Sequence, residues 1–84
     1  MSKVQIYSTG WCPYSFAAKV LLDDKGVVYD EIDVTEPAMR ADMIQRAHGR
    51  RTVPQIFIGD THVGGYMELA DLDRSGKLDP LLKA

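Results

Sequence analysis

The chain has 84 residues, which is enough for one domain (1–84) and not for two, and 45% of them are hydrophobic. Ten basic and twelve acidic residues give a net charge of −2, which excludes the strong basic field expected of a protein that binds nucleic acid or anionic membranes. The single cysteine, Cys12, can form neither an internal disulfide nor a zinc cluster by itself. It is therefore either a buried structural thiol or a thiol that reacts with a partner outside the chain.

The N-terminal segment carries one lysine and no long apolar core, so we expect no signal peptide. No apolar run reaches the roughly 18 residues that would predict a membrane span. We therefore expect a cytoplasmic monomer in a reducing compartment, with no contact to membranes.

The first half of the chain predicts a strand, a helix and a second strand. Residues 3–7 alternate, with Val4 and Ile6 opposite Gln5, as is typical of a strand. After a loop at residues 8–11, Pro13 is well placed to open a helix that ends at Lys25-Gly26. Apolar side chains at helical spacing predict the inner face of this helix: Phe16, Ala17, Val20 and Leu21. Residues 27–29 and 32–34 predict the second strand.

The second half predicts a helix, two strands and another helix. A helix over residues 36–47 has its inner stripe at Met39, Met43 and Ile44. Strands follow at 55–58 and 61–63, then a helix at 66–74 and a short turn or helix at 79–82. The order β-α-β-α-β-β-α predicts an α/β fold, because a strand–helix–strand unit makes a parallel pair and a two-residue connection makes an antiparallel one. We expect a mixed four-stranded sheet flanked by three helices.

Cys12 lies between the first predicted strand and the first predicted helix. A helix N-terminus carries partial positive charge and unpaired N–H groups, which stabilise a thiolate and lower its pKa. Because the thiolate is the reactive form, this position predicts a nucleophile. Ser15 follows three residues later, where a dithiol enzyme would carry its second, resolving cysteine. Its hydroxyl either hydrogen-bonds the sulfur or satisfies backbone N–H groups of the first helical turn.

Three spaced motifs carry a resemblance to a known family. Cys12-Pro13-Tyr14-Ser15, Thr52-Val53-Pro54 and Gly64-Gly65 occur in the order found in glutaredoxins, and the chain resembles the short bacterial class of that family over essentially its whole length. The resemblance implies the thioredoxin fold and the reduction of disulfides with glutathione.

The resemblance also implies roles for individual residues. Cys12 would be the catalytic nucleophile that takes up glutathione, which acts as co-substrate. In the family the bond before the loop proline is cis, and Val53 would pair with the backbone of glutathione as an added strand does. The remaining glutathione-binding positions implied by the resemblance are Tyr14, Arg40, Thr52, Pro54, Gly65, Tyr66 and Met67.

Arg40 and the glycine pair have a physical reason to bind glutathione, and each has an ordinary alternative. The guanidinium of Arg40 matches the glycine carboxylate of glutathione, but it could equally be a solvated helix charge. Gly64-Gly65 would let the N–H groups at the start of the third helix hold the γ-glutamyl carboxylate, or it could be a plain turn.

The chain departs from the family at three places. Ser15 replaces the second cysteine, Met67 replaces an acid that would bind the glutathione amino group, and Ser8-Thr9 stand where many relatives carry a lysine. Glu68 follows Met67, but its side chain points about 100° round the helix. Without a resolving cysteine the resemblance predicts a monothiol mechanism that acts on glutathionylated proteins and no longer reduces protein disulfides directly.

Two other functions stay open from the sequence. A glutaredoxin-like chain could carry an iron–sulfur cluster through Cys12 and glutathione, although Pro13 differs from the glycine of relatives known for that role, so we expect no metal. The chain could also be a catalytically silent peptide-binding module.

Other polar and aromatic residues carry less information. His48 and His62 have no metal-like spacing with Cys12, and we expect both at the surface or in turns. The basic group Arg46, Arg50 and Arg51 is either a positive rim that attracts carboxylates or a solvated helix end. Trp11 would cover the thiol, contact a protein partner or simply pack.

Overall fold

The structure, a computed structural model, describes residues 2–84. Met1 lies outside the described residues, although it belongs to the expected single domain and to the N-terminal segment in which we expect no signal peptide. Eight elements follow the predicted order, with a short helix added at the end. They are β1 (Val4–Ser8), α1 (Pro13–Asp24), β2 (Asp30–Asp33), α2 (Pro37–Arg46), β3 (Gln55–Ile58), β4 (Thr61–Gly64), α3 (Tyr66–Arg74) and α4 (Leu78–Lys83).

The sheet has the strand order β2-β1-β3-β4, which confirms the expected mixed topology. β1 pairs in parallel with β2, so that Ser8 is opposite Asp33 at the carboxyl ends of both strands. β1 and β3 are antiparallel, with Ile6 opposite Ile56, and β3 and β4 form an antiparallel hairpin with an irregularity between Ile56 and Phe57. The chain therefore passes from the end of β1 into α1 at the edge where β3 begins.

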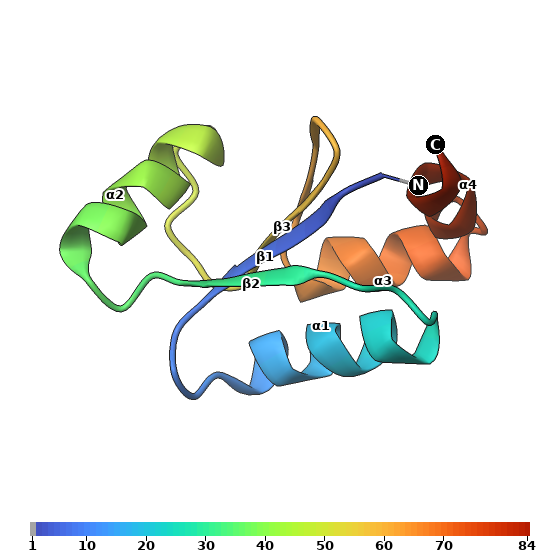
Figure 1. Ribbon diagram of the computed structural model, residues 1–84, viewed down its shortest axis with the longest axis horizontal. Coiled ribbons are helices and arrows are strands. Elements are labelled where there is room, and N and C mark those ends of the chain that lie inside the picture. Colours follow the sequence, from blue (N-terminus) through green and yellow to red (C-terminus); the bar gives the residue numbers. More distant parts are fainter. Residues whose placement is uncertain (1) are drawn as a thin grey trace.

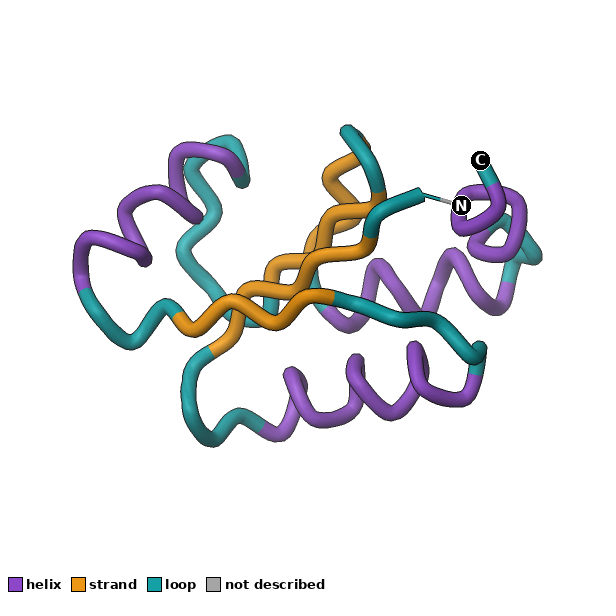
Figure 2. Tube along the Cα trace, viewed as in Figure 1, coloured by secondary structure: helices purple, strands orange, loops and turns teal. Residues whose placement is uncertain are grey.

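The helices form layers on the two faces of the sheet. α1 and α3 lie side by side below it in Figure 1, and α2 lies above it. The same arrangement is visible in Figure 2, where the strands form the central layer. α4 lies next to the N-terminal end, where the backbone N–H of Ser2 donates to the carbonyl of Leu82 at 3.1 Å.

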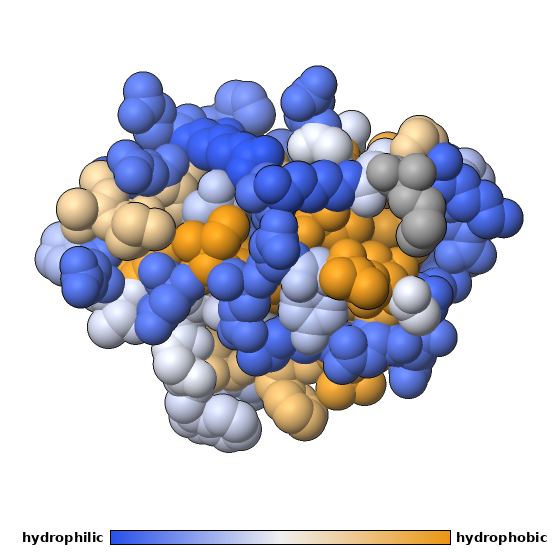
Figure 3. All heavy atoms as spheres, in the orientation of Figure 1, coloured by the Kyte–Doolittle hydropathy of each residue, from blue (hydrophilic) through white to orange (hydrophobic). Residues whose placement is uncertain are grey.

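The main core is one cluster between the sheet and the helices α1, α3 and α4. Val4 and Ile6 of β1 point into it, in agreement with the alternation seen in the sequence. Polar and charged side chains cover much of the face in Figure 3, with hydrophobic atoms visible between them. The other buried members of the cluster are Ala18, Leu22, Val27, Ile56, Ile58, Leu69, Leu78 and Leu82.

The predicted inner faces of two helices were wrong in part. In α1 the buried residues are Ser15, Ala18 and Leu22, whereas Phe16 and Val20 are 57% and 41% exposed. The helix has apolar residues on two sides, and the small side chains of Ser15 and Ala18 allow the backbone to approach its neighbours closely. In α2 Met43 is buried as expected, Ile44 is half-buried and Met39 is 40% exposed.

The second strand differs from prediction, and the C-terminal segment takes one of the two forms expected for it. β2 is the polar run Asp30–Asp33 rather than residues 27–29 and 32–34, because it is an edge strand that pairs only with β1. Val27 and Val34 are buried outside the strand, while Val28 is 89% exposed. The short C-terminal segment is a helix, α4, which is a fourth helix beside the three expected.

Residues 2–84 contain neither a membrane-spanning helix nor a cluster of metal ligands. None of the helices there is long and apolar enough to cross a bilayer. Within the same residues, no group of three or more His, Cys, Asp or Glu side chains is placed to hold a metal ion.

Candidate active site

Cys12 is the residue immediately before α1 begins at Pro13. It has the extended backbone conformation of an N-cap, with φ −148° and ψ 118°. The thiol is half-buried, and its Sγ lies 3.8 Å from the carbonyl oxygen of Val53, which comes from the loop before β3. The fold thus brings the thiol to a backbone segment 41 residues away in the chain.

The surroundings of Cys12 lower its pKa below the ordinary value for a thiol. Burial acts in the opposite direction and raises the pKa, but hydrogen bonding by the backbone N–H and the hydroxyl of Ser15 and by the N–H of Tyr14 outweighs it. These donors are the free groups of the first helical turn. A lowered pKa makes the thiolate, which is the nucleophile, available closer to neutral pH.

Ser15 is buried, with 2% of its surface exposed. Its hydroxyl lowers the pKa of the sulfur, although its Oγ makes no hydrogen bond of regular geometry within residues 2–84. The side chain therefore does not cap the backbone of the helix. Neither of the two hydrogen bonds considered for Ser15, to the sulfur or to the backbone, is formed with regular geometry, but the effect on the pKa of Cys12 agrees with a hydroxyl near the thiol.

A groove of about 250 Å³ runs beside the thiol, between the loop before β3 and the start of α3. The Val53–Pro54 peptide bond in this loop is cis, as expected. The rings of Tyr14 and Tyr66 lie 6.5 Å apart between their centroids. The groove is lined by Tyr14, Arg50, Thr52, Val53, Pro54, Gly65, Tyr66, Met67 and Glu68. Seven of the eight positions predicted to bind glutathione are therefore together in one groove.

Arg40 is the predicted position that does not line the groove. It is half-buried in α2, and its Nη2 donates a hydrogen bond of 2.7 Å to the carbonyl of Arg51. Arg40 therefore holds the chain that leads into the loop at Thr52.

Arg50 is a groove residue that the sequence did not single out from its basic neighbours. Its Nη1 lies 2.8 Å from Oε1 of Glu68, and the same Oε1 accepts the N–H of Gly65 at 2.8 Å. These interactions, the Gly65 N–H first and Arg50 second, lower the pKa of the Glu68 carboxyl. The Glu68 carboxylate thus accepts a hydrogen bond from one of the free N–H groups at the start of α3.

Gly64 is required by this arrangement. It has φ +111°, and a Cβ at this position would lie 2.5 Å from Oε1 of Glu68 and 2.6 Å from Nη1 of Arg50. At Gly65 the nearest atom to such a Cβ would be the carbonyl oxygen of Pro54, at 3.5 Å. Side chains of the protein therefore crowd Gly64 more closely than Gly65, and the binding of a ligand carboxylate at the glycine pair stays a prediction.

The other two arginines of the basic group have different environments. Arg46 at the end of α2 lies over the ring of Phe57, 4.0 Å from its centroid, and donates to Gln5 and to the hydroxyl of Tyr7. Arg51 is exposed. Of the three, Arg50 lines the groove, so a positive rim there would consist of Arg50, while Arg51 fits the alternative of a solvated charge.

Trp11 and the two histidines also differ from the simplest expectations. Trp11 is 79% exposed, so it does not pack in the interior. His48 is exposed in a turn with φ +58°, as predicted, but His62 is half-buried in β4, and their Nδ1 atoms lie 3.2 Å apart. The prediction for His62 was wrong because β4 is covered by the segment that follows α2.

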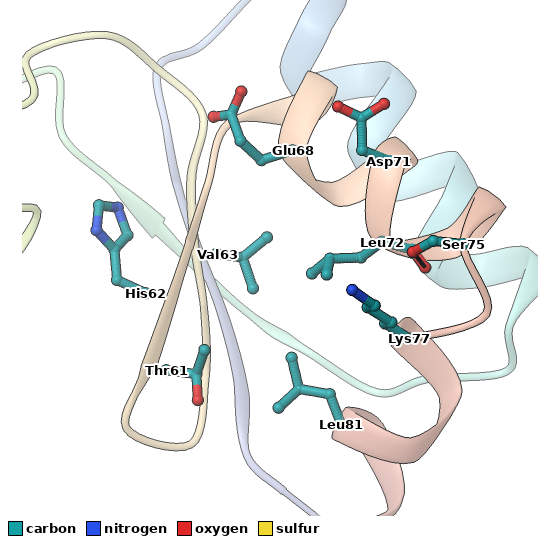
Figure 4. A pocket seen from close by; sticks show the side chains of 9 residues that line it. All are labelled: Thr61, His62, Val63, Glu68, Asp71, Leu72, Ser75, Lys77 and Leu81. Carbon is teal, nitrogen blue, oxygen red and sulfur yellow. Dashed lines mark hydrogen bonds between the residues drawn. The ribbon is translucent and has the colours of Figure 1, made fainter.

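A second cavity, larger at about 490 Å³, lies between β4, α3 and α4 (Figure 4). Val63, Leu72 and Leu81 point into it, and the ring of His62 lies on the opposite side of the hairpin. The smaller groove is the one beside the thiol, because Val53, which lines it, places its carbonyl oxygen 3.8 Å from Sγ of Cys12.

Comparison with known proteins agrees with this geometry. A profile of the glutaredoxin family matches residues 4–63. A glutaredoxin of Pseudomonas aeruginosa is 53% identical over 85 residues, which cover 100% of both chains, and glutaredoxin 3 of Escherichia coli K12 is 50% identical over 84 residues, which cover 99% of this chain and 100% of that one. The crystal structure of a buckwheat glutaredoxin–glutathione complex has a TM-score of 0.88 at 35% identity, covering 98% of this chain and 77% of the other.

The chain belongs to the glutaredoxin family and has its thioredoxin fold. The family consists of thiol–disulfide oxidoreductases, which makes Cys12, the single cysteine of the sequence, the candidate redox centre.

Proposed function

We propose that the protein reduces glutathione mixed disulfides by a monothiol mechanism through Cys12. The observation that carries this proposal is a thiol of lowered pKa at the edge of a groove, with serine in place of a resolving cysteine and no other cysteine in the chain. The substrates are glutathionylated proteins, and glutathione is the co-substrate.

The first step is attack of the Cys12 thiolate on the glutathione sulfur of a mixed disulfide. A bond forms between Sγ and that sulfur, the original disulfide breaks, and the departing protein thiolate takes a proton from water. In the second step the thiolate of another glutathione attacks the glutathione sulfur bound to Cys12. Oxidised glutathione leaves, and the Cys12 thiolate returns. Ser15 cannot form a disulfide, so the intermediate waits for the second glutathione.

The groove offers groups that suit a γ-glutamyl tripeptide. The backbone of Val53 extends beside the thiol, and Thr52 and Pro54 flank it, so an extended peptide could pair there. Tyr14 lines the same groove. A glutaredoxin bound to glutathione is a structural neighbour of this chain, which supports this choice of ligand.

The two ends of glutathione would meet different groups. Gly65, Tyr66 and Met67 stand at the start of α3, where N–H groups suit the γ-glutamyl carboxylate. Arg40, on the α2 side, would bind the glycine carboxylate after leaving the Arg51 carbonyl.

We propose that the protein works as a cytoplasmic monomer.

The proposal is tested by intact mass spectrometry after incubation with oxidised glutathione at neutral pH. We expect one glutathione adduct, absent from Cys12→Ser. In Ser15→Cys we expect the adduct to resolve into an internal disulfide, with release of glutathione, because position 15 lies three residues after Cys12, in the first turn of α1. Unmodified protein would contradict the proposal. A brown colour after anaerobic reconstitution with iron and sulfide would instead favour cluster carriage.

A further inference from the structure

Four polar residues, joined by hydrogen bonds, connect the exposed turn after α2 to the groove. Nδ1 of His48 lies 3.2 Å from Nδ1 of His62, and Nε2 of His62 lies 2.7 Å from Oε1 of Gln55. Nε2 of Gln55 donates to both oxygens of Thr52, at 3.0 Å to the carbonyl and 3.2 Å to the hydroxyl. We call this set, His48–His62–Gln55–Thr52, the His62 chain.

The direction of each hydrogen bond in the His62 chain follows from the chemistry of its partners when His62 is neutral. The Thr52 carbonyl can only accept, so the NH₂ group of Gln55 must face it and Oε1 of Gln55 must face His62. An amide oxygen can only accept, so Nε2 of His62 carries a hydrogen. A neutral imidazole has one N–H, which leaves Nδ1 of His62 as the acceptor and Nδ1 of His48 as the donor.

The surroundings keep His62 in this neutral form. Burial is the main cause that lowers its pKa, and the positive charges of His48, Arg50 and Arg46 act in the same direction, while Glu68 acts against them. The ring is also held in its plane by the ring of Phe57, whose centroid is 4.7 Å away at an angle of 19°. Asp71 and Lys77 line the cavity on the other side of the hairpin (Figure 4).

The His62 chain ends at the loop that borders the thiol. Thr52 lines the groove, and the next residue, Val53, places its carbonyl 3.8 Å from Sγ of Cys12. Gln55 is completely buried, so a Gln55 amide without its partners would carry the cost of an unsatisfied buried polar group. The orientation of Gln55 therefore fixes the position of Thr52.

We propose that His62 is a positioning residue for the groove: held by His48 in its Nε2–H form, it orients Gln55 so that Gln55 fixes Thr52 beside the reactive thiol. The proposal rests on the proposed function, because it makes His62 act on glutathione binding through Thr52. It predicts an effect on the binding of glutathionylated substrate rather than on the chemistry of the thiol. The reason is that the His62 chain ends at Thr52, which lines the groove, and not at the sulfur of Cys12.

The first experiment is ¹⁵N–¹H long-range NMR of the histidine rings near pH 7.5, with His62→Ala and His48→Ala used to assign the signals. We expect the hydrogen of neutral His62 on Nε2 and none on Nδ1. A hydrogen on Nδ1 would overturn the proposal. This readout needs no activity, so it still decides the matter if Cys12 forms no glutathione adduct and the proposed function fails.

The second experiment is steady-state kinetics on a glutathionylated peptide. For His62→Ala we expect KM to rise about 3- to 10-fold, the effect of losing one hydrogen bond, with kcat nearly unchanged. In His62→Gln the side-chain amide can again donate to Gln55, so KM should return most of the way. Thr61→Ala, a change at an exposed neighbour in β4, is the control and should match the unmodified protein.

An unchanged KM in His62→Ala would overturn the proposal, as would an equal rise in His62→Ala and His62→Gln. If His62→Ala fails to fold, the tautomer and the KM of His62→Gln decide the matter. A hydrogen on Nδ1 of His62 in the unmodified protein would then count against the proposal. So would a KM for His62→Gln as high as the KM of a groove variant such as Thr52→Gly.

Discussion

The pKa of Cys12 is lowered by groups that lie within one helical turn. The N–H groups of Tyr14 and Ser15 and the hydroxyl of Ser15 all act on the sulfur, and together they outweigh the effect of burial. A serine at this position is thus more than the absence of a resolving cysteine, because it contributes a donor to the thiolate. The surroundings of the thiol lower its pKa locally, whereas the proposed function requires a second thiol from outside the chain to complete the reaction.

At the residue scale, the pH dependence of Cys12 alkylation tests this account. Reaction with iodoacetamide should follow the thiolate, with a midpoint below the ordinary thiol pKa of about 8.5. Ser15→Ala should move the midpoint upward, because one donor to the thiolate is lost. Ser75→Ala, in which the hydroxyl removed donates only to the Leu72 carbonyl, is the matched control. A midpoint at or above 8.5 in the unmodified protein would contradict the argument.

The same shift has a consequence for stability. Folding lowers the pKa of Cys12, so the unfolded chain binds this proton more tightly than the folded chain. The free energy of unfolding therefore rises with pH between the lowered pKa and the ordinary one.

At the scale of elements, the junction between β4 and α3 is the most constrained part of the groove. Gly64 has a positive φ and leaves space for the Arg50–Glu68 pair, while Gly65 gives its N–H to Glu68. One of the free backbone N–H groups at the start of α3 is therefore already hydrogen-bonded within the protein. A ligand carboxylate would have to use the remaining N–H groups.

Gly64→Ala tests this junction by urea unfolding. We expect a loss of about 1–3 kcal/mol, because a side chain is unfavourable at φ +111° and its Cβ would overlap the Arg50–Glu68 pair. Gly10→Ala serves as the control, since a Cβ there meets nothing within 4 Å. Equal stability of the two variants would contradict the claim that a side chain at position 64 is unfavourable.

At the scale of the whole molecule, the terminal segments complete the main core. Leu78 and Leu82 of α4 pack into the same cluster as Val4 and Ile6 of β1. Lys25, just after α1, forms ion pairs with Asp73 of α3 at 2.6 Å and with Asp79 of α4 at 3.0 Å. The core and these exposed contacts join the first and last elements into one unit.

Leu78→Ala should therefore lower the free energy of unfolding by about 2–5 kcal/mol, as is usual when a large side chain is removed from a core. Val28→Ala, at a position 89% exposed, should change it by less than about 0.5 kcal/mol. Both are measured by urea unfolding, in which we expect one cooperative transition. A small effect of Leu78→Ala, or a separate early transition, would show that α4 is not part of the folding unit.

Local signals in the sequence were sufficient for the order of the elements, though not for the bounds of β2, and they gave the candidate nucleophile. Period-two alternation predicted β1, Pro13 predicted the start of α1, and the position of Cys12 before that helix predicted an activated thiol. These properties depend on neighbours within a few residues. The inner face of α1 was not predictable in this way, because apolar residues occur on two of its sides and only the packing of the sheet selects one.

The tertiary structure alone decided the contacts that shape the groove. The Val53 carbonyl beside Cys12, Arg50 paired with Glu68, and His48 bonded to His62 each join residues from 14 to 41 positions apart. Such contacts follow from strand order and from the side of the sheet on which each helix packs, which no local pattern encodes. The sequence by itself determined which atom reacts, and the fold determined what surrounds it.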